Sequence, residues 1–282
     1  MLPAFLVENF GSIVQFPGVT IAGSEELTGH EAYHVANGRR DGGDYWSSIT
    51  PNNPASLTWP LDRTRGADML VLDRGHNLAG ATVSLLCSND NFTTLETVFT
   101  ATIPLTSLPG GTLDGANGAV TEDGAWLKRF PLRAARYWRF SIPALGSGIV
   151  AQVVGCWLGK SFYPSSQSDW LFTVPTSPDG GTLQGLEATS EAGWVGRGLQ
   201  TDRREGTIPL KLVSHFSYDL ARYHLQALFG YGRPMWIVFD DNMAERAFCA
   251  LRPQPQFGFR REQGWAYPLA MIPYQEHEAL RA

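Results

Sequence analysis

The chain has 282 residues, of which 43% are hydrophobic and 17% are charged, and its formal net charge at pH 7 is -5. This length suffices for one large domain or two ordinary ones. A negative net charge without a basic stripe excludes a nucleic-acid-binding surface. No window approaches the about 20 consecutive apolar residues that a membrane helix needs. The 30 glycines and 18 prolines favour a turn-rich, all-β chain.

Residues 1–24 are apolar and contain Phe5, Phe10 and Phe16. They lack a cationic start and a long apolar run, so they do not resemble a secretory signal. Two interpretations are open: an ordinary first strand of a sandwich, or an N-terminal arm that packs on a neighbouring subunit.

Residues 25–160 are predicted to form a β-sandwich. Ser56–Leu61 alternates between apolar and polar residues, and Pro60 within it indicates a sheet edge or a bulge. The glycine-rich stretch 107–124 predicts a long loop. The other expected strands are Met69–Leu72, Ala81–Cys87, Thr94–Thr102, Arg136–Ile142 and Ile149–Val154.

Residues 161–182 are rich in Ser, Pro and Gly and are predicted to be a linker. Residues 183–282 are predicted to form a second, β-rich domain with one α-helix, Ser217–Phe229, which ends at Gly230. Met235–Phe239 is apolar throughout, so we expect a strand that is covered on both faces.

The three cysteines, Cys87, Cys156 and Cys249, are far apart and odd in number. A disulfide framework is therefore not expected, and each is predicted to be a buried free thiol.

Polar clusters give little sign of catalysis. His30 and His34 flank Glu31 without the order of a zinc motif, so a loop is favoured over a metal pair. Asp240 and Asp241 are interpreted as a turn. No nucleophile elbow, Walker loop or dinucleotide fingerprint is present, and we expect no enzyme and no cofactor. A structural calcium ion is an open alternative, because Asp62, Asp68, Asp73 and Asp90 lie near strand ends.

Loop and aromatic residues are the candidate contact sites, because aromatic rings stack on sugars and anchor interfaces. Strand context also places Trp46 and Trp138 in the core. The candidate ligand-binding residues are Trp46, His76, Asn77, Asn91 and Trp126. The candidate interface residues are Phe5, Phe10, Phe16, Trp170, Trp194 and Trp236.

Several short segments within residues 40–158 resemble the discoidin or coagulation-factor C-type module, a galactose-binding-like jelly roll. They are Tyr45-Trp46, Ser56–Leu61, His76–Val83, Arg136–Phe140 and Val153–Gly155. The resemblance implies a domain that recognises a ligand, here a host-surface glycan, through the loops 41–54, 74–80, 88–93 and 107–124. The two cysteines that staple many extracellular members are absent.

Residues 190–276 resemble the C-terminal portion of minor or distal tail proteins of long-tailed bacteriophages. The resemblance lies in Leu225–Gly230, Gly232–Trp236, Asp240-Asp241, Ala247–Leu251 and Tyr267–Ile272. It implies a baseplate component of the virion that is assembled in the host cytoplasm. Such a protein forms a homo-oligomeric ring, with a hexamer favoured, and contacts tube and hub proteins.

The sequence therefore predicts a mainly β chain, with a galactose-binding-like jelly-roll sandwich followed by a β-rich tail-protein domain with one helix. The primary functional prediction is a structural component of a phage tail tip. Host-surface carbohydrate binding is the alternative.

Overall fold

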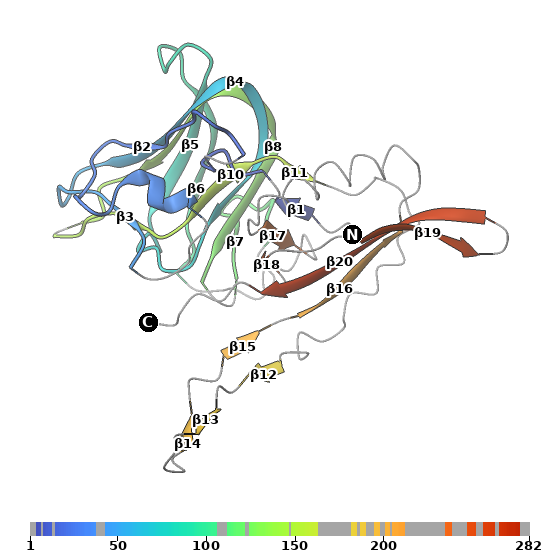
Figure 1. Cartoon of the computed structure of the whole chain (residues 1–282). Helices are drawn as coiled ribbons and strands as arrows, with labels where there is room; N and C mark the ends of the chain where they lie inside the picture. The colour runs from blue at the N-terminus through green and yellow to red at the C-terminus, as the bar shows by residue number, and fades with distance from the viewer. Residues whose placement is uncertain are drawn as a thin grey trace. The chain divides into compact units, whose positions relative to one another are not determined.

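The structure is a computed structural model of the whole chain (Figure 1). It describes residues 4–6, 8–12, 15–37, 43–105, 112–121, 124–146, 148–162, 182–184, 187–189, 195–197, 201–203, 205–211, 235–238, 247–251, 256–262 and 265–276.

The chain divides into two compact units. The first comprises residues 1–163, 236–247 and 279–282, and the second comprises residues 164–235 and 248–278. The segment predicted as a separate arm, residues 1–24, falls within the first unit.

The first unit is a β-sandwich of the jelly-roll type. The order within its main sheet is β10-β4-β8-β5-β6, with β2 beside β4 and β7 beside β8. These elements are β2 (Ala22–Gly23), β4 (Ala55–Leu72), β5 (Thr82–Ser88), β6 (Glu96–Thr102), β7 (Ala119–Val120), β8 (Trp126–Ile142) and β10 (Cys156–Gly159). A short pair, β3 (Trp46–Ser47) and β9 (Gln152–Val153), and the 3₁₀ helix η1 (Ala32–Ala36) complete this part.

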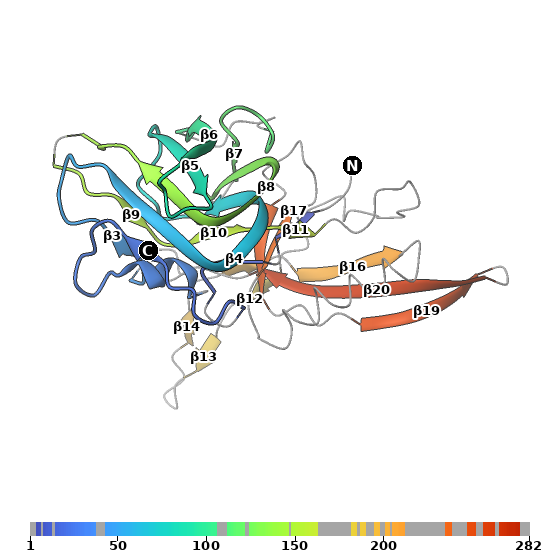
Figure 2. The ribbon, with the colours of Figure 1, turned by 90° about the horizontal axis from the view of Figure 1, so that it is seen from above.

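The strands β4 and β8 are long, antiparallel and curved, so the same pair runs through both layers (Figures 1 and 2). The pairing shifts between Pro60 and Arg65, and again between Ala67 and Met69. Extra residues in one strand bend it and increase its twist, so these bulges determine where β4 and β8 curve. Of the two alternatives that Pro60 left open, a sheet edge or a bulge, the structure shows the bulge.

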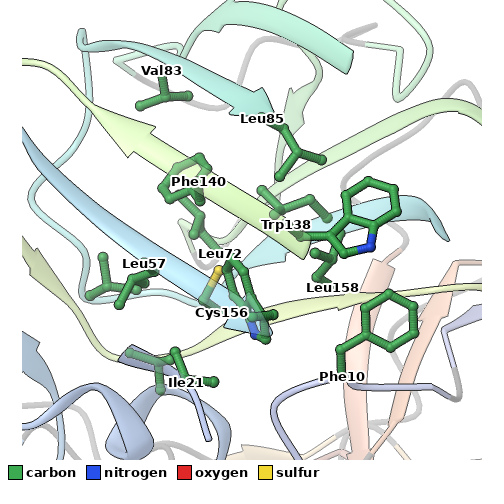
Figure 3. Close-up of a cluster of buried hydrophobic side chains, with 14 of the residues drawn as sticks. Phe10, Ile21, Leu57, Leu72, Val83, Leu85, Trp138, Phe140, Cys156 and Leu158 are labelled. Atoms are coloured by element: carbon green, nitrogen blue, oxygen red, sulfur yellow. The ribbon is translucent and has the colours of Figure 1, made fainter. Parts of the chain in front are cut away.

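The core lies inside the curve (Figure 3). Leu57, Trp59 and Leu61 alternate with half-buried residues and are 0–2% exposed, which confirms the predicted inward face of this segment. Trp138 and Phe140 face them from β8. Aromatic and branched side chains dominate, as close packing between two sheets requires.

The N-terminal segment packs on its own unit. Phe10 and Phe16 belong to the sandwich core, and the ring of Phe10 lies 6.3 Å from that of Trp138. This corrects the expectation of an arm whose phenylalanines contact a neighbouring subunit, because the apolar surface is already buried within the chain. Gly159 permits the arrangement, since a Cβ there would overlap the carbonyl oxygen of Glu8.

Strand pairing in the first unit also joins segments that are distant in the sequence. The strand β1 (Ala4–Leu6) pairs with β11 (Ser161–Phe162) on one side and with β17 (Met235–Val238) on the other. Phe5 and Trp236 are fully buried here, so neither is available as the interface anchor that the sequence suggested. The predicted apolar strand at Met235–Phe239 is confirmed for the described residues, all of which are buried.

The second unit is described by its backbone. Its longest strand, β20 (Trp265–Glu276), pairs with β16 (Glu205–Lys211), β18 (Ala247–Leu251) and β19 (Gln256–Glu262). Two further antiparallel ladders join β12 (Thr182–Gln184) to β15 (Thr201–Arg203), and β13 (Glu187–Thr189) to β14 (Val195–Arg197). The predicted helix Ser217–Phe229, the Asp240-Asp241 turn, and Trp170 and Trp194 lie outside the described residues.

Cys87 and Cys156 are buried free thiols, as the sequence predicted. Burial raises the pKa of both. Within the part of the chain that the structure describes, no helix is long and apolar enough to span a bilayer.

Candidate functional site

We define the loop end of the sandwich as residues 25–34, 44–53, 73–80 and 149–153. Backbone hydrogen bonds hold these four segments side by side: Leu27 N donates to Ser47 O, Ser48 N donates to Ala151 O, and Asn77 N donates to Gln152 O. β3 lies at this end, opposite the curve of β4 and β8, in both views (Figures 1 and 2). The loop end is therefore a connected surface built from distant parts of the sequence.

Glu25 organises one side of the loop end. Its carboxylate accepts hydrogen bonds from Thr50 N at 2.8 Å and from Asn53 Nδ2 at 2.9 Å. These bonds lower the pKa of Glu25, with the Thr50 amide as the largest cause. The backbone carbonyl of Glu25 accepts a bond from Trp46 Nε1 at 3.0 Å. One acidic residue thus joins a surface turn to a core tryptophan.

Aromatic rings occupy the adjacent part of the loop end. The rings of His30 and Tyr45 are stacked, with centroids 3.9 Å apart and planes 22° from parallel, and both residues are half-buried. His30 Nδ1 also lies 3.3 Å from Tyr45 O. Tyr33 is 56% exposed, and its ring lies 4.1 Å from that of His34. This part of the loop end therefore presents the exposed ring of Tyr33 near the half-buried stack of His30 on Tyr45.

His30 and His34 do not form a metal pair. His34 Nδ1 contacts a carboxylate oxygen of the buried Asp44, and its Nε2 lies 3.4 Å from Glu31. His30 instead stacks on Tyr45, so the two imidazoles serve different contacts. Across the described residues, no group of three or more His, Cys, Asp or Glu side chains gathers as a metal site.

Asn77 and His76 fix the third segment of the loop end. The Asn77 side chain donates to Val150 O at 2.7 Å and accepts from Gln152 N at 2.9 Å. His76 Nδ1 accepts from Leu78 N at 3.2 Å, and burial lowers its pKa to about 4. Both were predicted to contact a ligand, and the structure places both in hydrogen bonds that hold the loop.

Trp46 and Trp126 are fully buried. Trp126 Nε1 donates to Asn117 O at 2.8 Å, which ties the 112–121 loop to β8. This corrects the expectation that both rings stack on a ligand, because neither exposes a face. Strand context also predicts that Trp46 lies in the core, and this prediction is confirmed.

Asn91 lies at the other end of the sandwich, which we call the bend end: residues 61–65, 88–94 and 132–139. Asn89 joins these segments, because its Oδ1 accepts from Arg136 N at 3.0 Å and lies 3.3 Å from Thr64 Oγ1. The predicted ligand-binding loops are thus separated: 88–93 lies at the bend end, whereas 74–80 and the described part of 41–54 meet at the loop end.

The four aspartates considered for calcium have separate partners. Asp62 pairs with Arg65 at 3.0 Å, and Asp68 accepts from Ser161 N at 2.7 Å. Asp73 accepts from Arg74 N at 2.8 Å. Asp90 accepts from Ser88 and Thr94, which lowers its pKa to about 2. Their oxygens therefore do not converge as the ligands of a hard cation would.

Sequence reasoning missed Glu25, Tyr33 and the stacking of His30 on Tyr45. Glu25 and Thr50 are 25 residues apart, and their contact follows from the backbone bonds of Ser47 with Leu27 and His30 rather than from a local pattern. The one available signal was the aromatic pair Tyr45-Trp46, in which alternation along a short strand sends one ring outward and the other inward.

No family model matches the chain, and no curated protein matches it. Among solved structures, it is similar to chitosan-binding module 1 of a chitosanase/glucanase from Paenibacillus sp. IK-5, with 19% identity, 54% of this chain and 98% of that chain covered, and a TM-score of 0.39.

Two modules from Clostridium perfringens are also similar. CBM32-3 of a family 31 glycoside hydrolase has 17% identity over 49% of this chain and 90% of its own, with a TM-score of 0.37. CBM32-5, in complex with GalNAc-β-1,3-galactose, has 12% identity over 50% of this chain and 94% of its own, with a TM-score of 0.37. The fold is assigned from the structure of this chain itself. The chain is mainly β, and its first unit is a sandwich of the jelly-roll type.

Proposed function

We propose that the first unit is a carbohydrate-recognition module that binds uncharged or amino sugars at the loop end. The observation that carries the proposal is the half-exposed stack of His30 on Tyr45, with the exposed ring of Tyr33 on the same segment. Aromatic rings present flat apolar faces, and the C–H faces of sugar rings pack on them. The proposal is in keeping with the modules named above.

The rigidity of the surrounding loops supports binding. Glu25 and Asn77 together make five hydrogen bonds to the backbone or side chains of neighbouring segments. A surface whose loops are already ordered loses less conformational entropy when a ligand binds. The loop end is thus suited to hold ring faces in fixed positions.

The acidic groups at the loop end support recognition without bond cleavage. Glu25 and Asp44 are both engaged by hydrogen-bond donors, and the bonds to Glu25 hold its pKa below the ordinary value. A general acid for glycoside cleavage needs the opposite shift, a raised pKa beside a second free carboxylate. We therefore propose binding and no hydrolysis.

The test is a glycan array of neutral and amino-sugar oligosaccharides, followed by titration calorimetry of any hit against the whole chain. We expect Tyr45→Ala and Tyr33→Ala to reduce the affinity by about tenfold each, a typical cost for an aromatic anchor. Leu132→Ala is the matched control, because Leu132 is also 56% exposed but lies at the bend end. Retained affinity in both tyrosine variants would exclude the loop end.

A second candidate function is assembly with other copies or with tail proteins, as the resemblance of residues 190–276 implies. One observation favours it: the ladders β12–β15 and β13–β14 each have two strands, and among the described strands neither has a third neighbour. Two-stranded ladders are marginally stable in water, so a partner would stabilise them. Light scattering of the purified chain tests this: a ring is expected, and a monomer at all concentrations contradicts it.

A further inference from the structure

The outer face of the sandwich carries a cation without a counter-ion. Trp138 and Phe140 point into the core, so Arg139 between them points outward, beside Thr58 on β4 and Leu86 on β5. Arg139 is half-buried, and its Nε is fully buried. Within the described residues, its guanidinium has neither a hydrogen-bond acceptor nor a carboxylate partner. A half-buried charge without a partner requires an explanation, because burial without pairing is unfavourable.

The aromatic ring of Phe92 holds this guanidinium in place. The Cζ of Arg139 lies 4.0 Å from the centre of the Phe92 ring. Phe92 adopts a φ of 66° and Asn91 a φ of 56°, a conformation that bulky residues rarely adopt. The hydroxyl of Ser88 accepts from the amides of Asp90 and Phe92 and fixes the loop. Strain of this kind is concentrated at functional sites, where the surrounding structure enforces it.

A second arginine extends the same surface. Arg136 lies 5.3 Å from the centre of the Tyr137 ring, and the Tyr137 ring is 5.9 Å from that of Phe92. Arg136 is exposed, and its Nε donates to Leu61 O at 3.3 Å. The outer face therefore presents Arg139, Phe92, Tyr137 and Arg136 in succession. Stacked guanidinium groups keep their N–H edges available to donate hydrogen bonds to an anion.

The acidic side chains of the bend end are engaged elsewhere. Asp90 accepts from Ser88 and Thr94, and Asp62 pairs with Arg65. Glu96 on β6, which β5 separates from β8, pairs with Arg133 at 3.3 Å. None of the three appears among the contacts of Arg139, so the guanidinium retains its positive charge uncompensated by the described residues.

Hydroxyl groups form a row on this face. Ser56, Ser141, Ser84 and Thr100 stand opposite one another on four adjacent strands. Strands in a sheet are spaced by about 4.8 Å, so the hydroxyls form a regular row. Thr58, the direct neighbour of Arg139, belongs to the next row. Rows of hydroxyls next to two stacked arginines match a ligand that is both polyhydroxylated and anionic.

We propose that this face binds an anionic polysaccharide, whose carboxylate or sulfate group pairs with Arg139 and Arg136 and whose hydroxyls contact the serine and threonine rows. The site is separate from the loop end and does not depend on the function proposed for it. A polyhydroxylated ligand is favoured over nucleic acid because the chain carries a net charge of -5, whereas a phosphate backbone requires a strongly basic surface.

The experiment measures binding of the whole chain to immobilised heparin and to polygalacturonate, which carry sulfate and carboxylate groups respectively. Dextran, polyglutamate and duplex DNA serve as comparison probes. We expect binding to at least one anionic polysaccharide and a weaker signal for all three comparison probes. Arg139→Gln should lower the affinity by about tenfold, the usual cost of one charge-assisted bond. Phe92→Leu should lower it less, because the arginine remains but loses its platform.

The matched control is Arg133→Gln, which removes the same charge from a residue that pairs with Glu96. Its affinity should stay within about twofold of the parent, and thermal unfolding verifies that each variant is folded. Equal losses in the Arg133 and Arg139 variants would show unspecific electrostatic attraction and overturn the proposal. Equal or tighter binding of polyglutamate or DNA, or no binding to either polysaccharide, would also overturn it. Tyr45→Ala should leave this binding intact while weakening neutral-glycan binding by about tenfold.

Discussion

The loop end and the bend end of the first unit differ in how their polar side chains are satisfied. At the loop end, Glu25, Asp44 and Asn77 bond to neighbouring loop segments. At the bend end, Arg139 has an aromatic platform but no anion within the described residues. Polar groups that are fully paired within the chain stabilise a surface, whereas an unpaired charge leaves binding energy for a partner. The comparison teaches that exposure alone does not identify a site.

The largest expected effect is on the free energy of unfolding, which should fall more for a variant at the loop end than for one at the bend end. Trp46→Ala removes a fully buried ring and its bond to Glu25, so we expect a loss of about 3–5 kcal/mol in the free energy of unfolding. Phe92→Ala at the bend end removes a half-buried ring and should cost about 1 kcal/mol. Urea denaturation of both variants measures the difference. Similar losses would mean that the bend end is as integral to the fold as the loop end.

Acid should loosen the loop end before the bend end. The pKa of His76 is lowered to about 4 by burial. The unfolded chain therefore binds the proton more tightly, and stability falls as the pH drops from about 6.5 to 4, by at most about 3 kcal/mol. The pKa of Asp90 is lowered to about 2, so its contribution persists above about 4 and is lost towards pH 2.

Denaturant midpoints measured from pH 8 to 2 check this order. His76→Asn is the informative variant, because an asparagine oxygen can still accept the Leu78 amide but does not titrate in this range. Its stability should depend much less on pH between 6.5 and 4. An unchanged slope in this variant would assign the acid sensitivity to other groups.

Asn77→Ala should have an intermediate effect. It removes two hydrogen bonds that join the 74–80 and 149–153 segments, at an expected cost of about 1–2 kcal/mol. Neutral-glycan binding should weaken with it, because the loops lose their fixed positions. Calorimetry and urea denaturation of the same preparation separate the two effects. Loss of anionic-polysaccharide binding in this variant would break the distinction between the two ends.

The smallest expected effect is at Asn91. Its side chain is exposed and its φ is 56°, so Asn91→Gly should change stability by no more than about 0.5 kcal/mol. Asn91→Val should cost about 1–2 kcal/mol, because a β-branched residue resists this conformation. Thermal unfolding of the pair shows whether the loop conformation persists in solution. Equal stabilities would mean that the loop adopts another backbone.

The sequence predicted the inner architecture well and the surface poorly, for a physical reason. The alternation of Leu57, Trp59 and Leu61 and the bulge at Pro60 follow from local rules that operate within a few residues. The buried state of Trp126 and the packing of Phe10 on Trp138 depend on segments that meet only after the chain has folded. Periodicity reports which face of a strand is apolar, but it does not report what covers a loop.

The candidate sites illustrate the same difference. Arg139 lies in the predicted strand Arg136–Ile142 and in the segment Arg136–Phe140 that resembles the discoidin module, and neither pattern assigns its side chain a ligand. Its lack of a carboxylate partner follows from cross-strand pairing with Thr58 and Leu86, and from the placing of Glu96 against Arg133. The fold class can be predicted without knowing which residues pair across strands, whereas the candidate functional residues cannot.

The pairing of β1 with β17 has a consequence for biosynthesis. The strand at residues 4–6 gains one of its two neighbours only when residues 236–238 have left the ribosome. Until then, the newly made first unit carries an unpaired strand edge, the feature through which nascent chains associate wrongly. A fragment that stops at residue 163 would keep that edge permanently and should precipitate, whereas a chain that includes residues 236–238 closes it.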